Sequence, residues 1–360
     1  MAKGHSNFYC WMDLQKLEQF LKDNNQPKFR LEQIKKAVYQ DGISAFSEIT
    51  TLSKDLREAL EKEMKVLSFE VKKVLPSNDG NSAESLLELS DGKLIESVLI
   101  SPKPGLWSVC VSCQAGCPVG CRFCATGKMG FKRNLTAEEI ADQVLFWRQY
   151  LQKNLKFKIS NLKLTNVVYM GMGEPFLNWE QVSESIKILT DKKLFGFGSR
   201  SLSVSTAGIA EGIEKMAKEF PQVNLAVSLH FADDEKRGQY MPINKKDNLE
   251  SLKKALQKYF EITKRKVFLE YIMLDKINDS AEDAKKLADY IYSIGKLQLL
   301  HVNLIRFNAT PETSIENLKP SSKNQTQFFK KELENRHISI TIRKSLGEEV
   351  QGACGQLATH

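Results

Sequence analysis

The sequence predicts an α/β protein built around a partial (β/α)6 barrel of the TIM-like kind. Between residues 107 and 335, short apolar segments alternate six times with segments of helical periodicity, and one more strand follows. Six successive strand–helix units indicate a parallel sheet with helices outside it, whereas a closed barrel needs eight units. Because such barrels place their active sites where the strands end, we expect an open barrel with a site at that edge.

Six pairs of segments support this prediction. The strand segments are apolar, and the helical segments have apolar residues at spacings of three and four. A capping box over Thr136–Glu139 begins the first helix, and Asn178 is a candidate N-cap of the second. The expected pairs are strand 107–112 with helix 136–151, strand 165–171 with helix 178–190, strand 201–206 with helix 208–219, strand 223–229 with helix 247–259, strand 266–274 with helix 280–293, and strand 299–306 with helix 322–335, before a last strand at 338–343.

Two smaller parts precede the barrel. The N-terminal residues have the pattern of short amphipathic helices separated at Pro27 and Gly42, and three strand patterns follow as a connecting β-ribbon. The expected division is a helical RNA-binding accessory domain (1–66), the ribbon (67–102), the barrel (103–347) and a C-terminal tail (348–360). The cations of the helical part either meet phosphate or form a solvated helix face; they are Lys28, Arg30, Lys35 and Lys36.

Composition limits the class of protein. The chain has 360 residues, 42% hydrophobic and 27% charged, which is ordinary for a globular protein and excludes a wholly disordered chain. Lys and Arg number 52 against 44 Asp and Glu, and the net charge of +8 permits an anionic partner without establishing one. The sequence has neither an apolar run of the roughly 18 residues that a membrane helix needs nor a secretory signal. We expect a cytoplasmic protein without a membrane partner.

The placement of cysteines is the strongest chemical signal. Five of the seven lie within fifteen residues, between Cys110 and Cys124, whereas disulfide scaffolds are short secreted chains with cysteines spread along them. The spacing Cys117-x3-Cys121-x2-Cys124, in a loop with Gly and Pro, is typical of an iron–sulfur cluster that keeps one iron open. The alternatives are buried free thiols and a zinc site with Cys110 or Cys113 as fourth ligand. Structural zinc sites favour a second pair of cysteines, which this cluster lacks.

Further candidate residues stand at the ends of four predicted strands. In Gly171-Met-Gly173-Glu174, glycines permit close approach of backbone to a ligand, and Glu174 could accept hydrogen bonds from an ammonium or ribose group. Alone, this segment would also fit a glycine-rich turn with a surface Glu, and a lone histidine is more often structural. The other strand-end residues are Ser205, Ser228, Leu229, His230 and Asn308.

Taken together, these motifs resemble a known family. Three cysteines at this spacing on a partial barrel resemble the radical S-adenosylmethionine superfamily. The same loop combined with Ala353-Cys354-Gly355-Gln356-Leu357 near the C-terminus resembles the RlmN/Cfr family of RNA methyltransferases, and the likeness runs from the helical N-terminal part through the barrel to Leu357. One departure is Cys113, where the resemblance leads us to expect Ser, and we assign it no role.

The resemblance implies cofactors and site roles. Three cysteines, Cys117, Cys121 and Cys124, would hold a [4Fe–4S] cluster whose open iron binds S-adenosylmethionine, with two molecules of that cofactor used per turnover. Cys354 would carry the methyl group as S-methylcysteine into a transient protein–RNA crosslink, and Cys110 would resolve it by forming a disulfide with Cys354. Glu96 would act as proton acceptor, unless it is a surface carboxylate. Cofactor contacts would come from Gly173, Glu174, Ser205, Ser228, Leu229, His230 and Asn308.

The resemblance also implies substrates and partners. We expect methylation of C2 of an adenosine in 23S rRNA, near the peptidyl-transferase centre, and of the adenosine next to the anticodon in some tRNAs. The alternative is C8 methylation of the same rRNA adenosine, the Cfr activity; Pro175 favours C2, and Leu300–Asn308 favours C8. A flavodoxin or ferredoxin would donate the electron, and the protein would be a monomer.

Two other function classes make different predictions. A non-catalytic zinc RNA-binding module would contain zinc without iron or sulfide, and a radical enzyme for a small molecule would leave Cys354 idle. If RNA is the substrate, its target base must unstack to reach a buried site, and phosphate contacts make binding salt-sensitive. The candidate phosphate contacts, each also explicable as a solvated surface charge, are Lys128, Lys132, Arg133, Lys245, Lys246, Lys264, Arg265, Arg343 and Lys344.

Overall fold

The computed structural model describes residues 10–11, 13–153, 163–314, 316–343 and 355–357. This part of the chain contains a 10-stranded sheet in the order β14-β13-β12-β11-β10-β9-β6-β5-β4-β3. From β14 to β6 all neighbouring strands are parallel, which confirms the predicted barrel. These strands are β6 (Leu106–Cys110), β9 (Lys163–Tyr169), β10 (Leu202–Thr206), β11 (Asn224–Ser228), β12 (Val267–Met273), β13 (Leu300–Arg306) and β14 (Ile340–Ile342).

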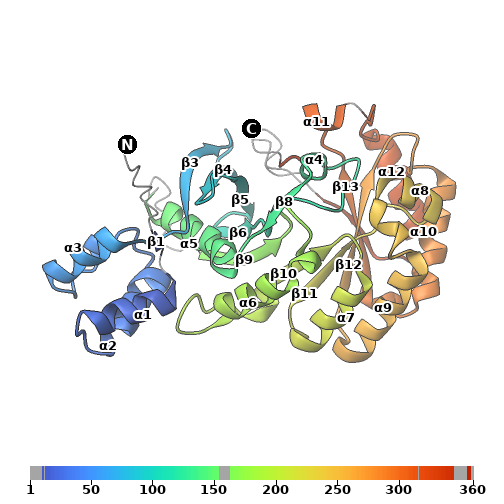
Figure 1. The fold of residues 1–360 in the computed structure, drawn as a ribbon. Coiled ribbons are helices and arrows are strands. Elements are labelled where there is room, and N and C mark those ends of the chain that lie inside the picture. The colour runs from blue at the N-terminus through green and yellow to red at the C-terminus, as the bar shows by residue number, and fades with distance from the viewer. Residues whose placement is uncertain (1–9, 12, 154–162, 315, 344–354, 358–360) are drawn as a thin grey trace, which may run out of the picture.

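Helices cover the outer face of the parallel sheet (Figure 1). On β11, Leu225 and Val227 are completely buried in the core, whereas Asn224 and Ser228 on the opposite face are partly exposed. Alternate side chains of a strand point to opposite faces, so the barrel wall has an apolar outer face and a more polar inner face. The covering helices are α5 (Ala137–Lys153), α6 (Trp179–Thr190), α7 (Ala210–Glu219), α9 (Leu249–Thr263), α10 (Ala281–Ile294) and α12 (Lys323–Glu334), and the short helices α8 (Asp234–Tyr240) and α11 (Pro311–Ser314) follow β11 and β13 in the chain.

Two helix starts show how side chains set these boundaries. Before α5, the Glu139 N–H donates to Thr136 Oγ1 at 3.2 Å and the Thr136 N–H donates to Glu139 Oε2 at 3.0 Å, which confirms the predicted capping box. Asn178 stands at the N-cap position of α6 but makes no capping bond. Its Nδ2 donates instead to the carbonyl oxygens of Cys113 and Leu135, at 2.8 and 2.9 Å. Asn178 is therefore the N-cap residue, as predicted, but its amide fastens the cysteine-containing segment instead of capping the helix.

The predicted ribbon is part of the main sheet. Its strands β3 (Phe69–Pro76), β4 (Ser82–Leu89) and β5 (Leu94–Lys103) pair antiparallel and continue the sheet beyond β6. They therefore extend the barrel wall. The hairpin of β7 (Gln114–Gly116) and β8 (Phe131–Asn134), which brackets the cysteine motif, has no counterpart in the sequence prediction. Strands this short do not establish a period-two pattern.

The N-terminal helices sit on the first barrel helix. Gln149 and Lys153, both on α5, donate to the Ile43 carbonyl oxygen at 2.8 Å and to Ser44 Oγ at 2.5 Å. This places the helical unit beside the barrel wall, at one end of the molecule (Figure 1). Its elements are β1 (Cys10–Trp11), α1 (Leu14–Asp23), α2 (Phe29–Lys35), α3 (Lys54–Glu63) and β2 (Met64–Lys65).

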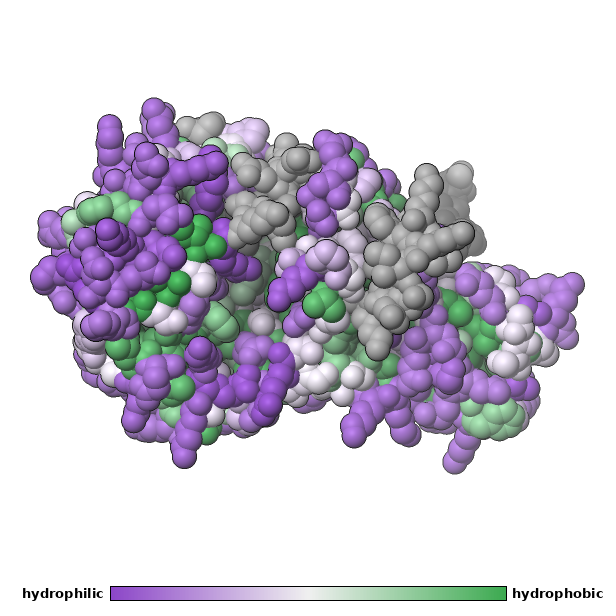
Figure 2. Space-filling model, turned by 180° about the vertical axis from the view of Figure 1, so that it is seen from behind, coloured by the Kyte–Doolittle hydropathy of each residue, from purple (hydrophilic) through white to green (hydrophobic). Residues whose placement is uncertain are grey.

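Charged and polar residues dominate the surface. Figure 2 shows hydrophilic side chains over the barrel and over the N-terminal helices alike, with small apolar patches between them. Within the described ranges, no helix has the length and apolar character that crossing a membrane requires.

Candidate functional site

The three cysteines of the cluster motif lie on one loop between β7 and α4 (Ala125–Lys128), past the carboxyl end of β6. Cys121 is 9% exposed within an apolar cluster that includes Phe123, and Cys117 and Cys124 pack against that cluster. Burial raises the pKa of Cys117 to about 12 and also raises the pKa values of the Cys121 and Cys124 thiols. The charge of Cys124 further raises the pKa values of the Cys117 and Cys121 thiols.

The donor set fits an iron–sulfur cluster. Three thiols on one loop supply the soft sulfur ligands that such a cluster takes, and their apolar surroundings exclude water from it. Ligand thiols must be deprotonated, so the positive charge of the bound iron would have to offset the raised pKa values. Over the described residues, no three Cys, His, Asp or Glu side chains surround a point where a single metal ion could sit.

Gly171 and Gly173 let the end of β9 pass close to the cysteine loop. A Cβ on Gly171 would lie 2.7 Å from the Val111 carbonyl oxygen, and a Cβ on Gly173 would lie 2.6 Å from Gln114 Cβ. Gly173 also has a φ of +104°, which side chains disfavour. Between the glycines, the Met172 carbonyl oxygen accepts the N–H of Gln114 at 3.2 Å. We predicted from the sequence that these glycines make room for a ligand, whereas in the structure protein atoms fill that space.

Glu174 joins the ends of β9 and β10. Its side chain is buried, with Oε2 accepting the Ala207 N–H at 2.6 Å and Oε1 accepting the Phe176 N–H at 3.1 Å. Burial raises the pKa of Glu174 to about 7, although these hydrogen bonds act in the opposite direction. Both carboxylate oxygens thus bind backbone, and a contact with the cofactor stays a prediction.

The other strand-end residues come to the same edge of the barrel. Ser205 of β10 and Ser228 of β11 are partly exposed on the inner face, and Asn308 follows β13 in a buried position. The Leu229 side chain is completely buried in the core, and its N–H donates to the Glu270 carbonyl oxygen at 3.0 Å. A cofactor contact by Leu229 would therefore be limited to its backbone.

His230 connects the cysteine loop with the barrel wall. Its Nδ1 accepts the Ile272 N–H at 3.1 Å, and its ring packs edge-on against Phe123 with centroids 4.9 Å apart. Burial, reinforced by the charge of Arg237, lowers the pKa of His230 to about 3. The imidazole is therefore neutral at pH 7 and carries its proton on Nε2. This geometry gives His230 a structural role, beside which its predicted cofactor contact is untested.

The predicted proton acceptor and resolving thiol share one face of the sheet. Cys110 on β6 lies opposite Val98 on β5, and Glu96 precedes Val98 by two residues. Residues two apart on a strand point the same way, so Glu96 and Cys110 are diagonal neighbours. Glu96 is buried, its carbonyl oxygen accepts the Ser112 hydroxyl at 2.5 Å, and Cys110 is partly buried.

The methyl-carrying cysteine proposed from the sequence, Cys354, lies outside the described residues, so the disulfide with Cys110 stays a prediction. The three residues that follow it, Gly355–Leu357, are described and lie against α4. The structure thus brings the end of the chain to the cysteine loop, more than 200 residues away in sequence.

One residue important to this edge was not predicted from the sequence. Arg237 is completely buried and donates from Nη2 to the Ala207 carbonyl oxygen at 2.5 Å and from Nε to the Leu229 carbonyl oxygen at 3.2 Å. Its Nη1 donates to Asn244 Oδ1 at 2.7 Å. Arg237 therefore ties together the segments that follow β10 and β11. Its sequence context, a short polar helix, is typical of a solvated arginine and contains no signal of this role.

Several predicted phosphate contacts are engaged inside the protein. Arg133 forms ion pairs with Glu139 at 2.8 Å and with Asp91 at 2.6 Å, which raise its pKa, and Lys128 is paired with Glu316. Arg343 is likewise paired with Glu270, at 3.4 Å. A carboxylate already holds each of these cations, and their contacts with RNA stay a prediction. Lys344 lies outside the described residues. The candidates that are exposed and form no ion pair with a described residue are Lys132, Lys245, Lys246 and Lys264.

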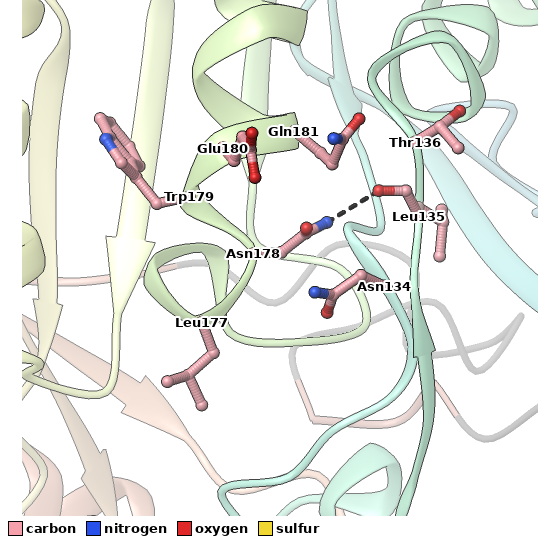
Figure 3. Close-up of a pocket in the computed structure, with 8 residues that line it drawn as sticks. All are labelled: Asn134, Leu135, Thr136, Leu177, Asn178, Trp179, Glu180 and Gln181. Carbon is pink, nitrogen blue, oxygen red and sulfur yellow. Dashed lines mark hydrogen bonds between the residues drawn. The ribbon is translucent and has the colours of Figure 1, made fainter.

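An open pocket of about 380 Å³ lies between the starts of α5 and α6 (Figure 3). Its walls are the last residue of β8, Asn134, the next two residues, 135–136, and residues 177–181. The Asn178 side chain extends toward Leu135 and binds its carbonyl oxygen. Because none of the predicted cluster or cofactor residues lines this pocket, we do not assign it to the predicted site.

Two family models together match most of the chain. Residues 111–290 match the model of the radical SAM superfamily, and residues 10–66 match the model of the ribosomal RNA large subunit methyltransferase N-terminal domain. The second match coincides with the N-terminal helices.

Individual relatives span nearly the whole chain. A protein of Clostridium botulinum (strain Okra) described as "Ribosomal RNA large subunit methyltransferase Cfr" is 42% identical over 95% of this chain and 96% of its own. A protein of Syntrophomonas wolfei described as "Probable dual-specificity RNA methyltransferase RlmN" is 39% identical over 96% of this chain and 95% of its own. Among solved structures, a radical SAM methyltransferase from Sphaerobacter thermophilus has a TM-score of 0.87 and 36% identity, covering 97% of this chain and 98% of that one.

Proposed function

The chain belongs to the RlmN/Cfr family of radical S-adenosylmethionine ribosomal RNA methyltransferases, and on this premise we propose that it methylates a ring carbon of an adenosine in 23S rRNA. One observation carries the proposal: the loop with Cys117, Cys121 and Cys124 lies at the strand-end edge of the barrel, with the residue after Cys354 docked against it. A zinc module or a small-molecule radical enzyme gives no reason for this approach of the C-terminal tail.

Each cysteine has a separate task in the proposed reaction. The Cys354 thiolate takes a methyl group from one S-adenosylmethionine and carries it as a thioether. After a hydrogen atom has been removed from that methyl group, its carbon bonds to the adenine ring. The base then carries an unpaired electron, which the cluster would take back when bound, and Glu96 accepts the proton of the ring carbon. The Cys110 thiolate attacks the sulfur of Cys354: a disulfide forms, the methylene–sulfur bond breaks, and the methylene carbon takes up a proton to become the methyl group of the released RNA.

Cys117, Cys121 and Cys124 would hold the [4Fe–4S] cluster, and Gly173, Glu174, Ser205, Ser228, Leu229, His230 and Asn308 would surround the cofactor. When bound, the cluster and S-adenosylmethionine supply the one-electron chemistry that removes the hydrogen atom. The protein contributes shielding from water by apolar neighbours of the loop and a neutral imidazole at His230, which adds no charge near the cysteines. A flavodoxin or ferredoxin would supply the electron.

We propose C2 as the methylated carbon, with tRNA as a second substrate. Gly-Met-Gly-Glu174-Pro175 supports C2 methylation. C8 is the second candidate, supported by the slightly higher identity to the Cfr relative than to the RlmN relative, 42% against 39%. The two outcomes differ in which carbon of the base faces the sulfur of Cys354.

Nucleoside mass spectrometry tests the proposal directly. The chain is expressed in a host without its own C2 enzyme, and rRNA and tRNA are digested and compared with 2-methyladenosine and 8-methyladenosine standards. We expect 2-methyladenosine in rRNA, lost in Cys354→Ala and retained in Cys113→Ser, the matched control with the residue expected from the resemblance. 8-Methyladenosine would reverse the choice of carbon, and neither product from an iron- and sulfide-containing protein would refute the substrate.

A further inference from the structure

The C-terminal tail docks on the turn that directly follows the third cluster cysteine. Helix α4 begins at Ala125, immediately after Cys124, and its N–H donates to the Gly355 carbonyl oxygen at 2.9 Å. One residue later, Thr126 Oγ1 donates to the Leu357 carbonyl oxygen at 2.7 Å. The residue after Cys354 therefore lies against the residue after Cys124, and both chain segments are visible side by side in Figure 1.

This contact is buried. Thr126 is 3% exposed, and Gln356 and Leu357 are 6% and 5% exposed. The Leu357 side chain belongs to the main hydrophobic core. Water therefore does not compete for the Thr126–Leu357 hydrogen bond, and removing the hydroxyl would leave a buried carbonyl oxygen without its donor.

The turn that receives the tail is also held by ion pairs to another segment of the chain. Glu316, which follows β13 and α11, forms ion pairs with Lys128 at the end of α4 and with Arg122 in the cysteine loop, the latter at 2.5 Å. Glu316 is 10% exposed at its side chain, so these pairs are partly shielded from solvent. The turn that receives the tail is thus fixed to the barrel independently of the tail.

We propose that Thr126 is a positioning residue that anchors the C-terminal tail on the cluster loop and so sets where Cys354 meets the cofactor. This inference rests on the proposed function, in which Cys354 carries the methyl group. A group held one residue from a fixed point reacts more often in the right orientation than a group on a free chain end. One neutral hydrogen bond shifts such a docking equilibrium by about twofold to tenfold.

Hydrogen–deuterium exchange of the full-length, cluster-loaded protein tests the anchor without measuring activity. The Ala125 amide is the reporter, because its hydrogen-bond acceptor is the tail. We expect Thr126→Val, which keeps the shape and removes the hydroxyl, to speed exchange in the peptide over 121–128 by about twofold to tenfold. Thr126→Ser, which keeps the hydroxyl, should exchange like wild type. Equal exchange in Thr126→Val and wild type would overturn the anchor.

A second variant acts from the tail, because the Thr126 side chain also acts on the neighbouring Cys124 thiol and its loss could disturb the cluster. Leu357→Ala weakens docking by removing a buried side chain and leaves the cysteine loop unchanged. We expect wild-type iron and sulfide content with a slower rate of Cys354 S-methylation, measured by peptide mass spectrometry. An unchanged S-methylation rate would overturn the positioning role. Absence of S-methylcysteine from the wild-type protein would instead refute the proposed function.

Discussion

Glu84 and Glu96 lie diagonally across two neighbouring antiparallel strands, on the same face of the sheet. Glu84 is opposite Val98, and Glu96 is opposite Leu86. Both carboxyl side chains are buried, at 7% and 3% exposed. Burial and, secondly, the charge of Glu96 raise the pKa of Glu84 to about 8. Glu84 is therefore mostly protonated at neutral pH, next to the residue proposed as proton acceptor.

Glu84→Gln should make stability less dependent on pH. The folded chain binds the Glu84 proton more tightly than the unfolded chain, whose pKa is near 4.5. The contribution of Glu84 to stability is thus complete below pH 4.5 and is lost as the pH rises through about 8. The unfolding free energy of the variant minus that of wild type should therefore increase by on the order of 2–4 kcal/mol from about pH 5 to about pH 9. Urea unfolding at both pH values measures this.

The matched control is Glu88→Gln, on the same strand and the same face. Glu88 forms an exposed ion pair with Lys72 at 2.8 Å, and such pairs contribute about 0–1 kcal/mol. The unfolding free energy of Glu88→Gln should therefore depend on pH as that of the wild type does. If Glu84→Gln also follows the wild-type pH profile, the neutral state inferred for Glu84 is wrong.

Gly173→Ala should disrupt the packing of the cysteine loop against the end of β9. The new Cβ would lie 2.6 Å from Gln114 Cβ, at a φ of +104°, so both the steric overlap and the backbone conformation oppose it. We expect a loss of about 2–5 kcal/mol in stability and markedly less iron bound per chain. Gly198→Ala is the control, because a Cβ there meets nothing within 4 Å and its φ is −70°. Thermal unfolding and iron analysis measure the two effects. Equal stability and iron content in Gly173→Ala and Gly198→Ala would contradict the prediction.

Arg237→Met should destabilise the strand-end edge of the barrel. The substitution keeps much of the apolar volume but leaves the carbonyl oxygens of Ala207 and Leu229 without their buried donor. A cost of about 3–5 kcal/mol is expected from the loss of such a network. Arg200→Met, which removes one exposed hydrogen bond to Gln222, should cost less than about 1 kcal/mol. Comparable denaturant midpoints for the two variants would show that Arg237 is not structural.

The salt dependence of RNA binding should come from phosphate contacts of the lysines that are exposed and form no ion pair with a described residue. Replacing Lys132, Lys245 and Lys246 with Gln should lower the slope of log affinity against log salt by about 0.7–0.9 for each phosphate contact removed. Lys187→Gln is the control, since Lys187 is paired with Glu184 at 2.9 Å on the outer helix α6. Filter binding of an rRNA fragment at several salt concentrations measures the slopes, and an unchanged slope in the triple variant excludes these lysines from the interface.

Features encoded within one segment were predictable from the sequence. The order of strands and helices follows from hydrophobic periodicity, and the capping box from Thr136 and Glu139, four residues of contiguous chain. The spacing of Cys117, Cys121 and Cys124 likewise identifies the chemistry of the loop, because ligand type and loop length are local properties.

The tertiary structure decided which distant groups meet. Neighbours from other segments determine that Asn178 binds the Cys113 carbonyl oxygen, that Arg237 is buried, and that Arg133 is paired with Glu139 and Asp91. The docking of Thr126 on Leu357 joins residues 231 positions apart. Periodicity reports only which face of a segment is apolar, whereas burial and hydrogen-bond partners depend on the surfaces that folding brings together.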